Sequence, residues 1–342
     1  MIRPRARTAA AIALLSSLLL AGCAAPGTAG DQRNPGEPRN TAEQGSAAQD
    51  DRPVVLTTFT VLADIAENVA GPHLRVASIT KVGAEIHGYE PTPGDIARAS
   101  EADLILDNGL GLEAWFAKFV DQLDVPHAVV TEDIEPLAIA GDVDAGKPNP
   151  HAWMSPRVVQ EYVAAIAAAF TELDPEHASD YAANAARYSA ELQEVQDELV
   201  AELAVLPESQ RALVTCEGAF SYLARDAGLT EQYIWPVNAE QQATPRQIAE
   251  TIEFVRAHDV PAVFCESTVS DAPMQQVVAA TDAAYGGTLY VDSLSEPDGP
   301  VPSYLDLIRH DAEVITAALT GDATPNGGAT PNNRATPNGG AE

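Results

Sequence analysis

Two histidines and two carboxylates have the residue types and the positions that metal binding requires. His87 and His151 lie in loops that contain Gly or Pro, while Glu217 and Asp292 each directly follow a predicted strand. Open α/β sheets hold ligands in the loops beyond the carboxyl ends of their strands. Two imidazoles with two carboxylates neutralise a divalent cation without any thiolate. The sequence therefore predicts one divalent-metal site formed by these four residues, two from each half of the chain.

Each of these residues also has a simpler explanation when it is taken alone. An isolated loop histidine is usually not a ligand, and a carboxylate after a strand often caps the next helix. Glu90 and Glu266 are candidates to accept the second N–H of a ligating imidazole, a contact that fixes its tautomer. Glu266 could instead cap the turn that follows it. The metal prediction therefore depends on the four ligands acting together.

Two cysteines, Cys216 and Cys265, lie at the ends of two predicted strands of the second half. If these strands are neighbours, the Cα atoms lie about 5 Å apart, within the range of a disulfide. Side chains that point to opposite faces would prevent the bond. Thiolate ligation of zinc is the alternative, although only two thiols are present. A disulfide between Cys216 and Cys265 is therefore a hypothesis.

The first residues have the pattern of a bacterial export signal. Three arginines precede an apolar run at 9–20, and a Leu-Ala-Gly-Cys sequence follows at 20–23. The run is too short for a permanent membrane span. We predict a lipoprotein signal peptide at 1–22 and lipid attachment at Cys23, which anchors the protein to the outer face of the cell membrane. An ordinary cleaved secretion signal is the alternative.

Segments near both ends lack apolar periodicity. Residues 23–51 are rich in Gly, Pro, Asn and Gln and are predicted to be a flexible tether, and residues 321–342 repeat Ala-Thr-Pro-Asn and are predicted to be disordered. The formal net charge of −31 argues against a nucleic-acid partner and favours cations.

Between these segments, strand and helix patterns alternate, which is typical of α/β units with parallel sheets. We predict an N-terminal α/β lobe at 52–173, a connecting helix at 174–206 and a C-terminal α/β lobe at 207–320, each lobe with a mostly parallel sheet flanked by helices. Strands are predicted at 54–59, 74–79, 104–106, 128–130, 212–215, 233–235, 262–264 and 289–291. Helices are predicted at 61–69, 95–102, 112–123, 220–227, 246–258, 274–284 and 304–319.

The connecting helix has the clearest helical periodicity. Apolar residues from Tyr181 to Leu203 recur along one stripe, Asp174-Pro175 offers a start signal, and Pro207 is a stop signal. At 1.5 Å per residue the helix is about 45 Å long. A helix of this length is best explained as a rigid link between two lobes.

Several stretches together resemble a known family. From Pro53 to Leu319 the chain is similar to the cluster A-I (TroA-like, ZnuA-like) solute-binding lipoproteins of metal ABC transporters, and most to their manganese-binding MntC type. The matching stretches occur at 87–93, 149–153, 215–220, 233–240, 266–268 and 292–295. The resemblance implies two α/β lobes, a rigid connecting helix and one interlobe metal. It also implies delivery to an ABC permease with a cytoplasmic ATPase, and we expect a monomer.

The identity of the metal is also predicted. Carboxylates bind through one oxygen or two, which suits Mn²⁺ or Fe²⁺ better than tetrahedral Zn²⁺. Zinc-binding members of the family carry a third histidine where this chain has Glu217, and usually a His-rich loop, whereas residues 131–148 contain no histidine. We predict Mn²⁺, with Fe²⁺ and Zn²⁺ as alternatives.

Two other functional classes remain open. A secreted metalloenzyme would use similar ligands, and the tether and repeats would permit an adhesin. The sequence contains no His-Glu-x-x-His, no Gly-x-Ser-x-Gly and no Gly-rich phosphate loop. We therefore predict that the protein binds and delivers a metal and is not an enzyme.

Overall fold

The computed structural model describes residues 50–116, 123–140, 145–237 and 243–321. The predicted signal peptide, Cys23, most of the tether and nearly all of the C-terminal repeats lie outside these residues. Within the described part, no helix is both long and apolar enough to cross a membrane. The described residues from Asp50 onward belong to one compact unit, so the proposed boundaries between lobes stay a prediction.

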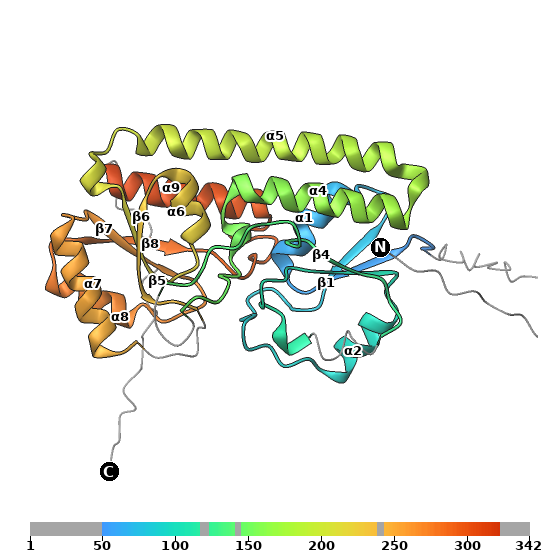
Figure 1. Ribbon diagram of the computed structural model, residues 1–342, viewed down its shortest axis with the longest axis horizontal. Helices are drawn as coiled ribbons and strands as arrows, with labels where there is room; N and C mark the ends of the chain where they lie inside the picture. The colour runs from blue at the N-terminus through green and yellow to red at the C-terminus, as the bar shows by residue number, and fades with distance from the viewer. Residues whose placement is uncertain (1–49, 117–122, 141–144, 238–242, 322–342) are drawn as a thin grey trace, which may run out of the picture. The chain divides into compact units, whose positions relative to one another are not determined.

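The first half of the fold is built on a four-stranded sheet in the order β2-β1-β3-β4, and every pair is parallel. The strands are β1 (Val54–Thr57), β2 (Arg75–Ser78), β3 (Leu104–Asp107) and β4 (His127–Val129). The helices α1 (Thr60–Ala70) and α2 (Pro93–Ser100) follow β1 and β2 (Figure 1). The predicted parallel α/β arrangement is confirmed here. Of the helix predicted at 112–123, residues 114–116 are helical and 117–122 lie outside the described residues.

The second half contains two parallel strand pairs, β5 with β6 and β7 with β8. The strands are β5 (Ala212–Glu217), β6 (Thr230–Trp235), β7 (Ala262–Glu266) and β8 (Ala284–Leu289). The helices are α6 (Ser221–Ala227), α7 (Pro245–Ala257), α8 (Ala272–Ala280) and α9 (Tyr304–Thr320). β5 also lies beside β7, so the two pairs meet along these strands.

The long helix α5 (Ala178–Leu203) is present but shorter than predicted. Asp174 and Pro175 start a 3-10 turn, η2 (Pro175–His177), and the α-helix begins after it. Its 26 residues give a length of about 39 Å. α5 packs against α1 and α4 of the first half and against α6 and α9 of the second half (Figure 1). One helix therefore supports both halves of the fold.

Helix α4 and strand β8 differ most from the predictions. Helix α4 (Pro156–Leu173) has no counterpart among the predicted elements, although Ser155 caps it and Pro156 is its first residue. β8 runs from Ala284 to Leu289, so the strand predicted at 289–291 is wrong. The glycines of β8 are poor strand formers, so the sequence does not indicate this strand. Gly286 lies against the Phe264 ring, and a Cβ at this position would come within 2.4 Å of a ring carbon.

A single buried apolar cluster extends through both halves. It includes residues of α1, α4, α5, α6 and α9. Large aromatic side chains fill it, and the hydroxyl groups of Tyr222 and Tyr304 donate to the carbonyls of Asn149 and Trp153. These bonds satisfy buried polar groups that would otherwise cost stability.

A second buried cluster contains both cysteines of the second half. The structure bonds Cys216 of β5 to Cys265 of β7, with a Cα–Cα distance of 4.9 Å. This distance agrees with neighbouring strands. The bridge lies directly beside Glu217 and Glu266, which are the last residues of the two strands.

Candidate metal centre

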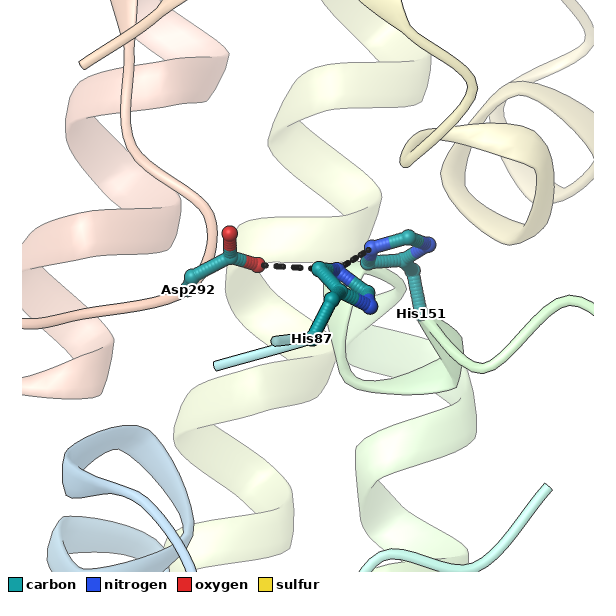
Figure 2. Close-up of side chains that lie close together, drawn as sticks. All are labelled: His87, His151 and Asp292. Atoms are coloured by element: carbon teal, nitrogen blue, oxygen red, sulfur yellow. Dashed lines mark hydrogen bonds and ion pairs between the residues drawn. The ribbon is translucent and has the colours of Figure 1, made fainter. Parts of the chain in front are cut away.

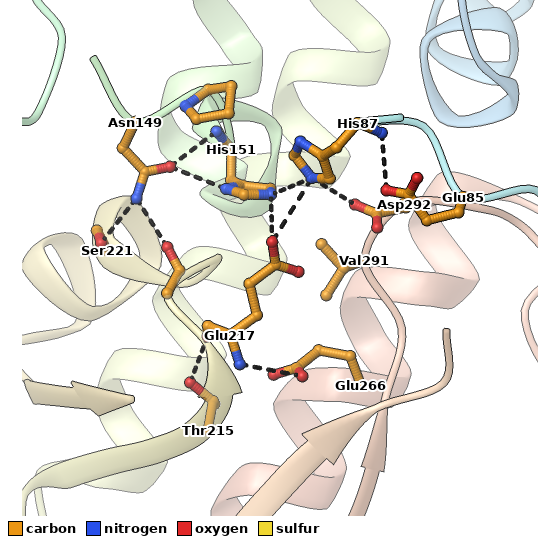
Figure 3. A network of polar contacts seen from close by, with 12 residues as sticks. Glu85, His87, Asn149, His151, Thr215, Glu217, Ser221, Glu266, Val291 and Asp292 are labelled. Carbon is orange, nitrogen blue, oxygen red and sulfur yellow. Dashed lines mark hydrogen bonds and ion pairs between the residues drawn. The ribbon is translucent and has the colours of Figure 1, made fainter. Parts of the chain in front are cut away.

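The four predicted ligands converge on one point (Figure 3), and Figure 2 shows His87 between His151 and Asp292. The Nε2 atom of His87 lies 3.0 Å from His151 Nε2, 3.6 Å from Glu217 Oε1 and 3.8 Å from Asp292 Oδ1. His151 Nε2 lies 3.8 Å from Glu217 Oε1. A cation with ligands at about 2.1 Å separates adjacent donor atoms by about 3.0–3.4 Å. The donor set therefore needs only small movements to enclose a cation.

The ligands come from four separate loops and strand ends. His87 lies between β2 and α2, and His151 directly precedes the 3-10 turn η1 (Ala152–Met154). Glu217 is the last residue of β5 rather than the residue after it. Asp292 lies three residues beyond β8, not directly after a strand as predicted, because the Tyr290 N–H donates to Asp311 Oδ1 of α9 at 2.9 Å.

The His87 loop is held by its own side chains and by one tryptophan. The Glu85 carboxylate accepts the N–H groups of His87 and Gly88 at 2.7 Å and 2.9 Å. Trp115 Nε1 donates to the Ile86 carbonyl at 2.9 Å. His87 is thereby fixed with its ring toward the other ligands, and only 6% of its side chain is exposed.

Asn149 fixes the ring of His151. Its Oδ1 accepts the backbone N–H of His151 at 3.0 Å and lies 2.9 Å from His151 Nδ1. Because Oδ1 can only accept, Nδ1 carries the proton and Nε2 keeps a free lone pair that faces His87 and Glu217. Asn149 was not among the predicted site residues. An Asn that bonds the backbone two residues later is a known local pattern, and Asn149-Pro150-His151 has that spacing.

The Asp292 segment is held through Trp153. The indole Nε1 of Trp153 donates to the Val291 carbonyl at 3.0 Å, and the Tyr304 hydroxyl donates to the Trp153 carbonyl at 2.6 Å. Trp153 and Tyr304 are both fully buried. Asp292 and the 149–153 loop that carries His151 are therefore held by the same aromatic pair.

The centre buries more negative charge than its surroundings neutralise. His151, Glu217 and Asp292 are fully buried. Both carboxylate oxygens of Asp292 are buried without a hydrogen bond from any described residue. Burial, with a further contribution from His87, holds the pKa of His151 well below its usual range, so this imidazole stays neutral. A divalent cation at this point would provide the charge that the carboxylates lack.

Glu266 has a different role from the one considered for it. Its Oε2 accepts the backbone N–H of Glu217 at 3.2 Å and not the N–H of an imidazole. Burial raises the pKa of Glu266 well above its usual range, with a contribution from the Glu217 carboxylate. Glu266 therefore contacts the metal centre through the backbone of a ligand. Glu90 is exposed and accepts no imidazole N–H among the described residues.

Cation binding is expected to weaken as the pH falls below about 7. Burial raises the pKa of Asp292 to about 7, and the Glu217 carboxylate adds to the rise while His87 opposes it. Below this pH a cation must displace the proton on Asp292, which costs up to about tenfold in apparent affinity per pH unit. Calorimetric titrations with Mn²⁺ at about pH 8 and about pH 6 measure this effect. Equal affinities at the two pH values would contradict it.

Comparisons with known proteins agree with this geometry. Residues 55–318 match the family model ZnuA, described as zinc-uptake complex component A, periplasmic. The chain is 52% identical to the iron-binding protein YfeA of Yersinia pestis over 262 residues, which covers 76% of this chain and 84% of that protein. It is 32% identical to the manganese-binding lipoprotein MntA of Halalkalibacterium halodurans over 312 residues, covering 90% and 97%.

A solved structure shares the fold. The Mn-bound periplasmic metal binding protein from Candidatus Liberibacter asiaticus superposes with a TM-score of 0.74 at 38% identity, and the match covers 78% of this chain and all of that one. The matching family consists of substrate-binding proteins and not of enzymes, which confirms the prediction that this chain is not an enzyme. The chain belongs to the ZnuA family of metal-binding, substrate-binding proteins of ABC importers.

Proposed function

We propose that this protein captures a divalent first-row cation outside the cytoplasm with His87, His151, Glu217 and Asp292. It then delivers the cation to the permease of an ABC importer, whose ATPase drives uptake. The observation that carries the proposal is the convergence of two imidazoles and two carboxylates at one buried point, with no hydrogen bond to Asp292 from the described residues. The cation is cargo, so the site needs affinity and a route of release but no catalytic group.

We propose Mn²⁺ as the cargo. The two oxygens of Asp292 are both available for bidentate binding, which raises the coordination number above the four that Zn²⁺ prefers. The donors are oxygen and imidazole nitrogen, which suit Mn²⁺ and Fe²⁺. The manganese-binding relative and the Mn-bound structural neighbour support this choice.

Fe²⁺ is the second candidate, because the relative at 52% identity is an iron-binding protein. Zn²⁺ generally binds nitrogen and oxygen sites more tightly than Mn²⁺ does. We therefore expect Zn²⁺ to bind well in vitro, and we propose that selectivity in the cell comes from geometry, metal supply or the permease.

The metal is best identified in protein purified from cells grown with balanced metals. We expect about one equivalent of Mn²⁺ or Fe²⁺ by elemental analysis, and an anomalous-scattering map should place it within bonding distance of all four ligands. Stoichiometric zinc that does not exchange with manganese would contradict the assignment to Mn²⁺. A cation bound elsewhere would contradict the site itself.

The rest of the chain fits the same function. We propose that the lipid on Cys23 anchors the protein to the outer face of the membrane, and that residues 23–51 act as the tether between lipid and fold. The protein would then act as a monomer close to its permease, with an N-terminal lobe at 52–173, a linker at 174–206 and a C-terminal lobe at 207–320. The repeats at 321–342 are proposed to be a disordered tail.

A further inference from the structure

A chain of hydrogen bonds leads away from the metal centre, starting at His151 (Figure 3). His151 Nδ1 lies 2.9 Å from Asn149 Oδ1, and Asn149 Nδ2 donates to Ser221 Oγ at 3.1 Å. The Ser221 hydroxyl donates in turn to Glu231 Oε2 at 2.6 Å. This series of hydrogen bonds therefore begins at His151, a proposed metal ligand, and ends at the carboxylate of Glu231 in β6.

The direction of each bond is set by its partners. Asn149 Oδ1 also accepts the His151 backbone N–H, which can only donate. Asn149 Nδ2 also donates at 2.7 Å to the Gly218 carbonyl, which can only accept. The amide therefore cannot be flipped, and His151 Nδ1 must be the donor. All three bonds run in the same sense, from the imidazole toward the carboxylate.

Aligned hydrogen bonds polarise one another, especially in a buried site. Metal-binding histidines commonly donate their second N–H to a carboxylate, which fixes the tautomer and makes the ligating nitrogen more basic. Here the carboxylate is Glu231, and the contact is made through two intervening groups, Asn149 and Ser221. The arrangement is an extended form of the carboxylate–histidine pair.

The same series of hydrogen bonds also joins the two halves of the fold. Asn149 lies in the loop before η1, whereas Ser221 begins α6 and Glu231 lies in β6. The Gly218 carbonyl that Asn149 contacts belongs to the residue directly after Glu217. One amide side chain therefore connects a ligand of the first half with the backbone beside a ligand of the second half.

We propose that Asn149, Ser221 and Glu231 form a positioning relay that presents Nε2 of His151 to the cation and strengthens it as a ligand. The inference deepens the proposed function, since it concerns a ligand of the same site. Burial raises the pKa of Glu231 to about 7. The relay is therefore best tested at about pH 8, where this carboxylate is ionised.

Ser221→Ala is the leading variant, because it removes the middle of the relay without touching a ligand. We expect its Mn²⁺ affinity to fall several-fold, and that of Asn149→Ala to fall by about 10- to 100-fold, as is typical for the partner of a ligating histidine. Ser221→Thr keeps the hydroxyl, so its Mn²⁺ affinity should be close to that of the wild type. Glu231→Gln keeps an acceptor but loses the charge, so we expect an effect in the direction of Ser221→Ala. The exposed Glu253→Gln is the matched control and should bind like the wild type.

A double-mutant cycle separates the relay from a general loss of structure. If Ser221 acts only through Asn149, the double variant N149A/S221A should bind Mn²⁺ no more weakly than N149A alone. Fully additive effects would overturn the relay. So would an S221A variant with wild-type affinity.

Ring ¹⁵N chemical shifts of His151 give a reading that needs no metal. In the metal-free wild type we expect a protonated Nδ1 and a bare Nε2, and a mixture of tautomers in Asn149→Ala. A wild type with a protonated Nε2 would overturn the proposal.

Mn²⁺ binding by the ligand variants separates the relay from the proposed function. If His87→Ala and His151→Ala bound Mn²⁺ like the wild type, the proposed function would fail. If they lost binding while Ser221→Ala did not, the relay alone would fail.

Discussion

Replacing His151 with alanine is expected to lower the affinity for Mn²⁺ by at least about 100-fold. Loss of a partner of a metal ligand already costs about 10- to 100-fold, so loss of the ligand itself should reach or exceed the upper end. His151 is fully buried, and its Nε2 lies within 3.8 Å of both His87 and Glu217 donor atoms. The variant leaves two buried carboxylates with one imidazole, so the remaining ligands cannot complete the coordination.

Thermal unfolding with and without Mn²⁺ measures this loss. At about a thousandfold excess of Mn²⁺ over the wild-type Kd, binding stabilises the wild type by about 4 kcal/mol, and a variant with 100-fold weaker binding by about 1.4 kcal/mol. The rise in Tm on adding Mn²⁺ should therefore be about 5–10 °C smaller in the variant.

His258→Ala is the matched control, because His258 directly follows α7, its Nδ1 lies 3.0 Å from the Phe254 carbonyl and its ring stacks on the Phe254 ring, away from the four ligands. It should keep the full Mn²⁺-dependent rise in Tm. An equal rise in wild type and His151→Ala would show that the cation binds at another place.

The double variant Cys216→Ser/Cys265→Ser is expected to have a free energy of unfolding about 4 kcal/mol lower than the wild type. The disulfide closes a loop between residues 49 positions apart, and the entropy that such a crosslink removes from the unfolded chain corresponds to about 4 kcal/mol. The two strands it joins carry Glu217 and Glu266 at their ends, so the loss falls on the part of the fold that holds the metal centre. Urea unfolding of the two proteins measures the change.

Reduced wild-type protein is the control that separates the crosslink from the substituted atoms. It keeps both sulfur atoms in the buried cluster, so its stability should also fall by a similar amount. Thiol titration of untreated, unfolded protein should find no free thiol from this pair. Two free thiols would contradict the disulfide.

The elements that the sequence reveals best are those whose periodicity is not interrupted. The apolar stripe from Tyr181 to Leu203 predicts α5, and the short apolar runs predict β1, β3 and β7. Starts and ends are less readable: a 3-10 turn at Pro175–His177 precedes α5, and the glycines of β8 lie against side chains that are distant in sequence. Gly286 is required by the Phe264 ring, a residue of another strand that no local pattern reveals.

The candidate site was predictable in its residues but not in its supports. Residue type and position beside loops and strand ends identify His87, His151, Glu217 and Asp292, and the structure brings them together. The relay from Asn149 to Glu231 joins residues of two halves, and only the folded chain shows that they meet. Glu266 is predicted as an acceptor for an imidazole N–H or as a cap, whereas its contact with the Glu217 backbone arises because β5 lies beside β7.

The order in which the four ligands occur along the chain has a consequence for how the protein is made. The last of them, Asp292, lies 12 residues before the start of α9, so no N-terminal piece that ends before Asp292 contains a complete set. A molecule that is still emerging on the far side of the membrane, or one that has lost the segment with Asp292 to a protease, therefore lacks one of the four ligands. The permease would then receive metal only from molecules whose chain has been exported at least as far as Asp292.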